Sequence, residues 1–167
     1  MMDVFVEREG RRVYHNSGLN DAVVTKGAVA RVIRMEVLVG AASMGLMEGD
    51  GVVVATPTGS TAYSMSAGGP IVEPTARNFV VSPICAHSIH SNSYVFSSEN
   101  VITVTPRDVG RKPVFLSVDG GRPFSLKAED RVVIRTSRYE TELIRLSDKS
   151  IFEILRTKMA GEVHHEK

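Results

Sequence analysis

Hydrophobic and polar residues alternate along much of this chain with a period of two, as they do in a β-strand that buries one face. In the longest run, Ile33, Met35 and Val37 fall on one face, which predicts a half-buried strand over 29–39. Residues 51–56 are apolar at almost every position, as in a strand that is covered on both faces. Further strands are predicted at 4–6 and 13–14, joined by a turn at Gly10, and at 20–24, 78–81, 94–97, 101–105, 114–118, 131–136 and 141–146, with a turn at 45–49.

Two segments favour a helix instead. Residues 60–67 are small and compatible with a helix, and Thr58 or Ser60 can serve as its N-cap. Near the C-terminus, Ser150 and Glu153 have the spacing of a capping box, and an apolar stripe follows as far as a glycine eight positions on. The pattern therefore predicts one mainly β domain with a short interior helix and a C-terminal amphipathic helix.

Composition and charge narrow the class of protein. The chain has 167 residues, 43% of them apolar, with 20 Lys and Arg against 19 Asp and Glu. No segment concentrates one sign of charge, which argues against partners such as nucleic acid or a membrane surface. No apolar stretch is long enough to span a bilayer, and the first residues lack the features of a secretory signal. Cys85 is the only cysteine, which excludes an internal disulfide and disfavours a zinc site, so we expect a cytoplasmic protein with no metal ligands.

The densest unusual stretch is 49–74, where an apolar strand ends in a loop rich in glycine and hydroxyl groups. Such a junction can direct backbone N–H groups toward an anion. No Lys or Arg occurs between Asp50 and Arg77, so a dinucleotide suits this loop better than a triphosphate with its metal. The candidate ligand groups are the hydroxyls of Thr58, Ser60, Thr61 and Ser66 and the ring of Tyr63. The alternative, a helix start whose hydroxyls only cap backbone donors, is equally compatible with the loop alone.

Four other residues carry groups that could do chemistry. Asn20 and Asp21 could hydrogen-bond ribose hydroxyls, although these two residues alone favour a turn or an Asx cap. His87 follows Cys85 by two residues, but no third group that would orient a nucleophile is evident, which favours a structural histidine. Asp119 begins an Asp-Gly-Gly turn signal and is only secondarily a candidate ligand carboxylate.

Several segments together resemble the NAD kinase family, whose members phosphorylate NAD to NADP. Residues 49–72, GDGVVVATPTGSTAYSMSAGGPIV, resemble the long signature of the family, and Thr-Pro-Thr-Gly-Ser-Thr-Ala-Tyr is its most specific part. Residues 18–24 resemble its Asn-Glu motif, 82–88 its Pro-His-Ser/Thr segment, 116–120 its Val-Asp-Gly strand end and 152–159 its terminal Phe-x-x-Leu-x-x-Lys-Leu helix. In order and spacing, these matches extend over nearly the whole chain.

The resemblance implies a fold, an assembly and a set of ligand contacts. In the family this region is the C-terminal domain, a two-sheet β-sandwich that binds NAD, and residues 1–167 would form it. The enzymes are dimers or tetramers in which a neighbouring subunit completes the site. The implied NAD contacts are Asn20 and Asp21 near the ribose and adenine, Asp50 toward the nicotinamide, and Thr58, Thr61, Ala62, Tyr63 and Ser66 along the groove. His87 and Asp119 are weaker transfers, and Asp21 stands where the motif usually has Glu, which shortens the reach of the carboxylate by about 1.5 Å.

The resemblance also implies a part that this sequence does not contain. Family members carry an N-terminal α/β domain with a Gly-Gly-Asp-Gly-Thr motif, which approaches the phosphoryl donor, ATP or polyphosphate with Mg2+, and supplies the catalytic base. No such motif occurs in the 167 residues, so we expect this chain alone to bind NAD without phosphorylating it and to hold no catalytic residue. Two alternatives stay open: a non-catalytic NAD(P)-binding module, and a domain of the lipid kinase type, which shares the two-domain plan.

Overall fold

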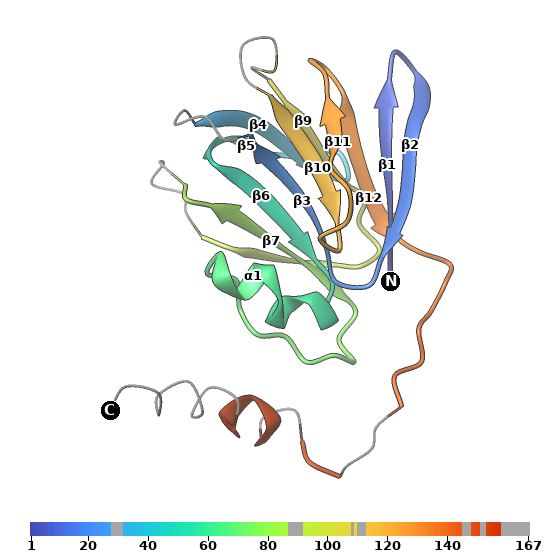
Figure 1. The fold of residues 1–167 in the computed structure, drawn as a ribbon, viewed down its shortest axis with the longest axis vertical. Coiled ribbons are helices and arrows are strands. Elements are labelled where there is room, and N and C mark those ends of the chain that lie inside the picture. The colour runs from blue at the N-terminus through green and yellow to red at the C-terminus, as the bar shows by residue number, and fades with distance from the viewer. Residues whose placement is uncertain are drawn as a thin grey trace.

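The computed structural model describes residues 1–27, 32–86, 92–107, 109, 113–144, 148–150 and 153–157, and it forms a sandwich of two six-stranded antiparallel sheets (Figure 1). The order of sheet A is β2 (Arg11–Gly18), β1 (Met2–Arg8), β12 (Arg131–Thr136), β9 (Ile102–Pro106), β4 (Ile33–Val39) and β5 (Ala42–Gly49). The order of sheet B is β11 (Phe124–Leu126), β10 (Val114–Val118), β3 (Asp21–Lys26), β6 (Gly51–Ala55), β7 (Asn78–Ile84) and β8 (Tyr94–Ser97). Two short helices, the 3-10 helix η1 (Thr58–Thr61) and the α-helix α1 (Tyr63–Ser66), follow β6. The predicted mainly β, two-sheet fold is confirmed.

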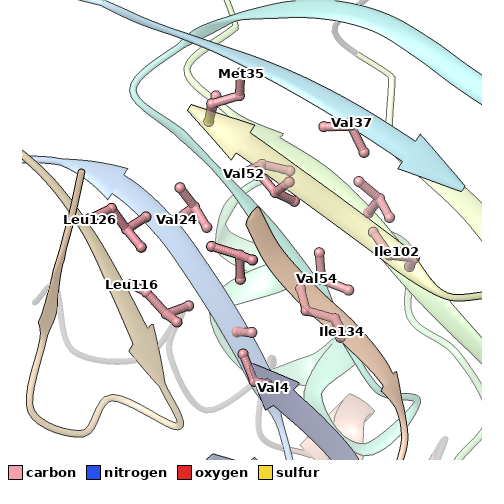
Figure 2. Close-up of a cluster of buried hydrophobic side chains, with 14 of the residues drawn as sticks. Val4, Val24, Met35, Val37, Val52, Val54, Ile102, Leu116, Leu126 and Ile134 are labelled. Carbon is pink, nitrogen blue, oxygen red and sulfur yellow. The ribbon is translucent and has the colours of Figure 1, made fainter. Parts of the chain in front are cut away.

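Apolar side chains from alternate strand positions fill the space between the sheets. Figure 2 shows Val4 and Ile134 from sheet A near Val24 and Val54 from sheet B, and all four are almost completely buried. Because successive side chains of a strand point to opposite faces, the neighbours of these residues point outward. The outward positions of β3 begin with Asp21.

The outer face of sheet B carries a second, smaller apolar cluster. Val23, Val53 and Val80 belong to it, and Ala67 and Val72 from the segment after α1 pack against it. β6 is therefore buried on both faces, as its unbroken apolar sequence predicts. This cover holds the segment that contains η1 and α1 against the outer face of sheet B (Figure 1).

The interior helix is shorter and less regular than predicted. Ala62, with φ of −96° and ψ of −132°, interrupts the helix between η1 and α1. Neither Thr58 nor Ser60 acts as the predicted N-cap, since no side-chain cap bond is present at either helix. Ser60 Oγ instead donates to Pro57 O at 2.7 Å and accepts a hydrogen bond from Val72 N at 3.0 Å. A single helical turn has little dipole, so the expected anion site at its start is not supported.

One turn prediction and one strand prediction are wrong, and two strands, β5 and β11, were not predicted. Residues 45–49 do not turn, because the turn lies at Gly40 (φ 58°) and Gly45 (φ 88°) is accommodated inside β5. Residues 141–144 form no strand; Leu143 and Ile144 are 65% and 86% exposed, since no neighbouring strand pairs with this segment. Of the two unpredicted strands, β5 occupies the predicted turn and β11 has only three residues. The described part of the predicted strand 29–39 is β4, and its predicted alternation is confirmed.

After β12 the chain leaves the sandwich, and Figure 1 shows the helical residues 153–157 away from both sheets. The predicted capping box is confirmed: Ser150 N donates to Glu153 Oε2 at 2.7 Å, and Glu153 N donates to Ser150 Oγ at 3.3 Å. Residues 151–152 and 158–161 of the predicted helix lie outside the described residues. We predict that this helix frays or docks on another chain.

A buried ion pair joins the end of β1 to the turn before β12. Arg8 Nε and Nη2 donate to Oδ1 and Oδ2 of Asp130, both at 2.7 Å, and Lys127 N donates to Oδ2 at 2.8 Å. Asp130 is completely buried. Burial alone would raise the pKa of Asp130, but the hydrogen bonds from Arg8 and Lys127 outweigh it and lower the pKa.

Candidate functional site

A pocket of about 470 Å³ opens on the outer face of sheet B, beside η1 and α1. Its lining residues are Asn20, Asp21, Val23, Thr25, Ala62, Tyr63, Ser117, Asp119 and Gly120. The outward positions of β3 form its floor, and the register of β10 against β3 places Ser117 opposite Val23. The segment at Ala62 and the end of β10 therefore face each other across β3, although they are far apart in sequence.

Asp119 fixes the backbone at the mouth of this pocket. Its Oδ2 accepts a hydrogen bond from Leu19 N at 2.7 Å, and its Oδ1 accepts from Asn20 N at 2.8 Å and from Asp21 N at 3.0 Å. Asp119 N donates back to Asp21 O at 3.0 Å. One carboxylate thus holds three consecutive amides, and it does so from a left-handed backbone conformation with φ of 48°.

The loop between β6 and η1 holds the same segment from the other side. Thr56 N donates to Asn20 O at 2.8 Å, and Thr56 Oγ1 donates to Leu19 O at 2.5 Å. Gly59 N in turn donates to Thr56 Oγ1 at 3.1 Å. A Cβ on Gly59 would lie only 1.9 Å from Asn20 O, so the loop can approach this closely only with glycine at that position. The segment Leu19–Asp21 is therefore held on both sides.

The pocket is electrostatically unusual because it buries an acid without a cation. Asp21 is only 5% exposed, and within the described ranges no group donates a hydrogen bond to its carboxylate. Burial, followed by the negative charge of Asp119, raises the pKa of Asp21. None of the residues that line the pocket is Lys or Arg. An unpartnered acceptor of this kind suits a ligand that brings its own hydroxyl or amino donors.

Four of the eight predicted contact residues line the pocket: Asn20, Asp21, Ala62 and Tyr63. Asp50 lies at the opposite end of β3 from Asp21, where Asp50 Oδ1 is 2.6 Å from Lys26 Nζ. It connects to the pocket only through its carbonyl oxygen, which accepts a hydrogen bond from Thr25 Oγ1 at 3.1 Å.

Thr58, Thr61 and Ser66 also lie outside the lining of this pocket. Thr61 Oγ1 donates to Thr58 O at 3.3 Å, within η1, and Ser66 is exposed at the end of α1. His87 lies outside the described residues. Asp119, a weaker candidate from the sequence, does line the pocket.

Four residues of the lining were not predicted: Val23, Thr25, Ser117 and Gly120. The first two could have been found from the sequence, because they follow Asp21 at the two-residue spacing of one strand face. Ser117 and Gly120 could not, because only the register between β10 and β3 brings them to Asp21.

The described residues contain no group of three or more His, Cys, Asp or Glu side chains that could hold a metal ion. No helix within the described ranges has the length and apolar character to cross a membrane.

Comparisons with known proteins agree with the fold and the motifs. The family model described as the ATP-NAD kinase C-terminal domain matches residues 19–146. An NAD kinase of Acetivibrio thermocellus is 35% identical over 159 residues, which are 95% of this chain and 55% of that protein. An NAD kinase of Symbiobacterium thermophilum is 41% identical over 165 residues, 96% of this chain and 56% of that protein. The chain thus spans little more than half the length of these relatives.

Two solved structures share the fold. Yeast NADH kinase in complex with NADH is 27% identical with a TM-score of 0.73, over 80% of this chain and 39% of that one. An NAD kinase from Archaeoglobus fulgidus in complex with ATP is 27% identical with a TM-score of 0.66, over 83% of this chain and 51% of that one. From the extent of the family match and the identity to its curated members, this chain belongs to the NAD kinase family, as a C-terminal domain of that family.

Proposed function

We propose that this chain is the NAD-binding portion of an NAD kinase, which transfers a phosphoryl group to the 2′-hydroxyl of the adenosine ribose of NAD. The observation that carries the proposal is the pocket beside α1, in which Asp119 holds the backbone of Asn20 and Asp21 and an exposed tyrosine ring forms part of the same lining. Its volume lies within the range of small-molecule sites, roughly 300–1,000 Å³.

The chemistry of the lining suits a dinucleotide. The Asp21 carboxylate lacks a protein donor and can accept hydrogen bonds from ribose hydroxyls, and the Asn20 amide can both donate and accept. Tyr63 is 45% exposed, which leaves a face of its ring free to stack on a base. Thr25 on the floor of the pocket and Ser117 on the neighbouring strand β10 add hydroxyl groups. Asp50, Thr58, Thr61 and Ser66 stay predicted contacts.

The phosphoryl donor, ATP or polyphosphate with Mg2+, would be held by a part of the protein beyond these 167 residues. Two findings support this division: the relatives are almost twice as long as the matched segment, and the printed sequence contains no Gly-Gly-Asp-Gly-Thr motif. Transfer requires donor, metal and acceptor in line. The chain alone would therefore bind NAD and not turn it over. We further propose that the complete protein is a cytoplasmic homo-oligomer, a dimer or a tetramer, in line with the family resemblance.

Calorimetric titration of the chain with NAD tests the binding. We expect saturable 1:1 binding that Asp21→Ala and Tyr63→Ala each weaken by at least tenfold, whereas Tyr63→Phe, which keeps the ring, binds as the unchanged chain does. Asn16→Ala, an exposed change on sheet A, is the control and should leave NAD binding unchanged. Binding that survives Asp21→Ala and Tyr63→Ala would contradict the assignment of the pocket.

A second assay tests the division of labour. The chain is incubated with NAD, ATP or polyphosphate and Mg2+, and NADP is measured with an NADP-specific dehydrogenase. We expect no NADP above background from the 167 residues. Turnover by the purified chain would refute the proposal that the donor site lies elsewhere, and binding of a diglyceride in place of NAD would favour the lipid kinase alternative.

A further inference from the structure

Two side chains of β1 that point outward from sheet A are buried, which is unexpected on an outer face. Val4 and Val6 of β1 belong to the core, so Asp3 and Phe5 point away from it. They are nevertheless only 7% and 4% exposed, although no strand or helix of the described structure lies over this face of β1. Side chains from β2 and β12 must therefore cover them.

The cover consists of the imidazole ring of His15 and two arginine side chains, which lie on the ring of Phe5. The His15 ring stacks on it with a centroid distance of 4.7 Å and an interplanar angle of 12°. The guanidinium carbons of Arg12 and Arg135 lie 3.7 Å and 4.9 Å from the ring centroid. A guanidinium that stacks on a ring keeps its N–H edge available for other partners. Phe5 thus orients two arginines without using their hydrogen-bond donors.

These arginines differ from others in the molecule in their lack of a carboxylate partner. Arg8 and Arg131 form ion pairs with N···O distances of 2.7 Å and 3.2 Å. Arg12, Arg135 and Arg138, by contrast, form no ion pair with any residue that the structure describes. The guanidinium of Arg138 lies over the ring of its neighbour, 4.9 Å from the centroid.

The three guanidiniums surround a hollow of about 520 Å³, which we call the arginine hollow. Asp3 is the only acid among its lining residues, and Asp3 Oδ1 already accepts a hydrogen bond from Ser17 Oγ at 2.9 Å. Tyr139 lies at the rim and is 53% exposed. The hollow is therefore electropositive: apart from Arg138 Nη2, which donates to Tyr139 Oη at 2.8 Å, no described residue accepts a hydrogen bond from these three guanidiniums. An exposed ring lies beside them.

We propose that the arginine hollow binds a small molecule that carries a diphosphate or triphosphate group. Guanidinium groups pair with phosphate oxygens through two parallel hydrogen bonds, and adjacent phosphates allow several arginines to bind at once. The exposed ring of Tyr139 can stack on an attached base. The hollow lies on the outer face of sheet A and the dinucleotide pocket on the outer face of sheet B, so this site is independent of the proposed function.

Titration of the 167-residue chain with inorganic pyrophosphate and with ADP, followed by calorimetry and by the NMR shifts of His15, tests the proposal. We expect saturable binding that weakens as NaCl is added, with tighter binding of ADP if the base stacks on Tyr139. Arg12→Gln and Arg135→Gln should each weaken binding by about tenfold. Arg131→Gln, a change at an arginine of β12 with a carboxylate partner, is the matched control and should leave binding unchanged.

Arg138→Gln removes a guanidinium of the hollow without uncovering Phe5, so weaker binding by this variant is not explained by a disturbed fold. It too should weaken binding, and thermal melts test whether each variant is folded. Three results would overturn the proposal. They are the absence of saturable pyrophosphate binding, equal binding by Arg131→Gln and the three hollow variants, and a dimer in sedimentation whose interface the hollow variants abolish.

Discussion

Replacement of Asp119 tests whether one carboxylate builds the candidate pocket. Asp119 accepts hydrogen bonds from three consecutive amides, those of Leu19, Asn20 and Asp21. A hydrogen bond to a charged group contributes about 1.5–3 kcal/mol when shielded from water, but Asp119 is exposed and water replaces part of each bond. We therefore expect Asp119→Gly to lower the free energy of unfolding by about 2 kcal/mol in total, less than the sum of three shielded bonds.

Two further variants separate the carboxylate from the backbone. Asp119→Ala has the same loss plus about 0.5–1 kcal/mol, because alanine tolerates a φ of 48° less well than aspartate does. Asp119→Asn keeps one side-chain oxygen, which can still accept from Asn20 N and Asp21 N, so it should lose only about 1 kcal/mol. Urea denaturation followed by circular dichroism measures these differences.

NAD titration of the same proteins provides the functional readout. If Asp119 positions Asn20 and Asp21, both variants should bind NAD more weakly than the unchanged chain. The loss of affinity should be smaller for Asp119→Asn and roughly tenfold or more for Asp119→Gly. Glu9→Ala is the matched control, since Glu9 is an exposed acid with φ of 51° in a distant turn, and it should stay within about 0.5 kcal/mol of the unchanged chain. Wild-type stability and wild-type affinity in Asp119→Gly would refute the reasoning.

Three further changes have expected outcomes of different sign. Asp130→Asn should destabilise the chain by about 3 kcal/mol at pH 7. Because the folded pKa of Asp130 is lowered, its contribution is complete above the unfolded pKa and disappears as the pH falls through the folded pKa. Urea curves of the two proteins should therefore differ at pH 7 and converge as the pH falls below the folded pKa of Asp130. Gly59→Ala places a Cβ 1.9 Å from Asn20 O, so it should lower the free energy of unfolding by at least about 3 kcal/mol and abolish NAD binding. Gly10→Ala, whose Cβ would meet nothing within 4 Å, is the control and should keep NAD binding. A stable Gly59→Ala protein that binds NAD would contradict the close approach. Asp21→Asn should stabilise the chain without ligand at pH 7, because a raised folded pKa means that the ionised carboxylate opposes folding above the unfolded pKa. In urea curves near pH 4 this gain in stability should vanish, and NAD binding at pH 7 should be weaker than in the unchanged chain. Lower stability of the variant at pH 7 would contradict the burial of the charge.

Local alternation was sufficient to predict most of the sandwich. The face shared by Ile33, Met35 and Val37 follows directly from the two-residue period, and these side chains are fully buried. Where prediction failed, non-local pairing decided the structure. Gly45 reads as a turn in isolation, yet it belongs to β5 because the residues on both sides of it pair with β4. Residues 141–144 alternate like a strand, yet they find no partner.

The candidate site likewise contains residues that the sequence predicts and residues that only the pairing of distant strands brings to it. Asn20, Asp21, Ala62 and Tyr63 were accessible from the sequence because each lies in a motif that resembles the family. The role of Asp119 was not accessible, because its three amide partners are about 100 positions away and only the pairing of β10 with β3 brings them together. From the sequence, that residue looked like part of an ordinary turn.

The hydroxyl-rich signature after β6 acts on the pocket in a way that its composition does not suggest. Its hydroxyls suggested direct ligand contacts, but those of Thr56 and Ser60 are engaged in holding the chain: Thr56 Oγ1 donates to Leu19 O, and Ser60 Oγ binds the backbone of Pro57 and Val72. Both residues are almost fully buried, so neither hydroxyl is free to meet a ligand. A hydroxyl that fixes Leu19 also fixes the next two residues, which line the pocket. Loss of Thr56 Oγ1 should therefore weaken NAD binding without removing any group that contacts NAD, whereas a direct contact such as Tyr63 should affect binding without affecting stability.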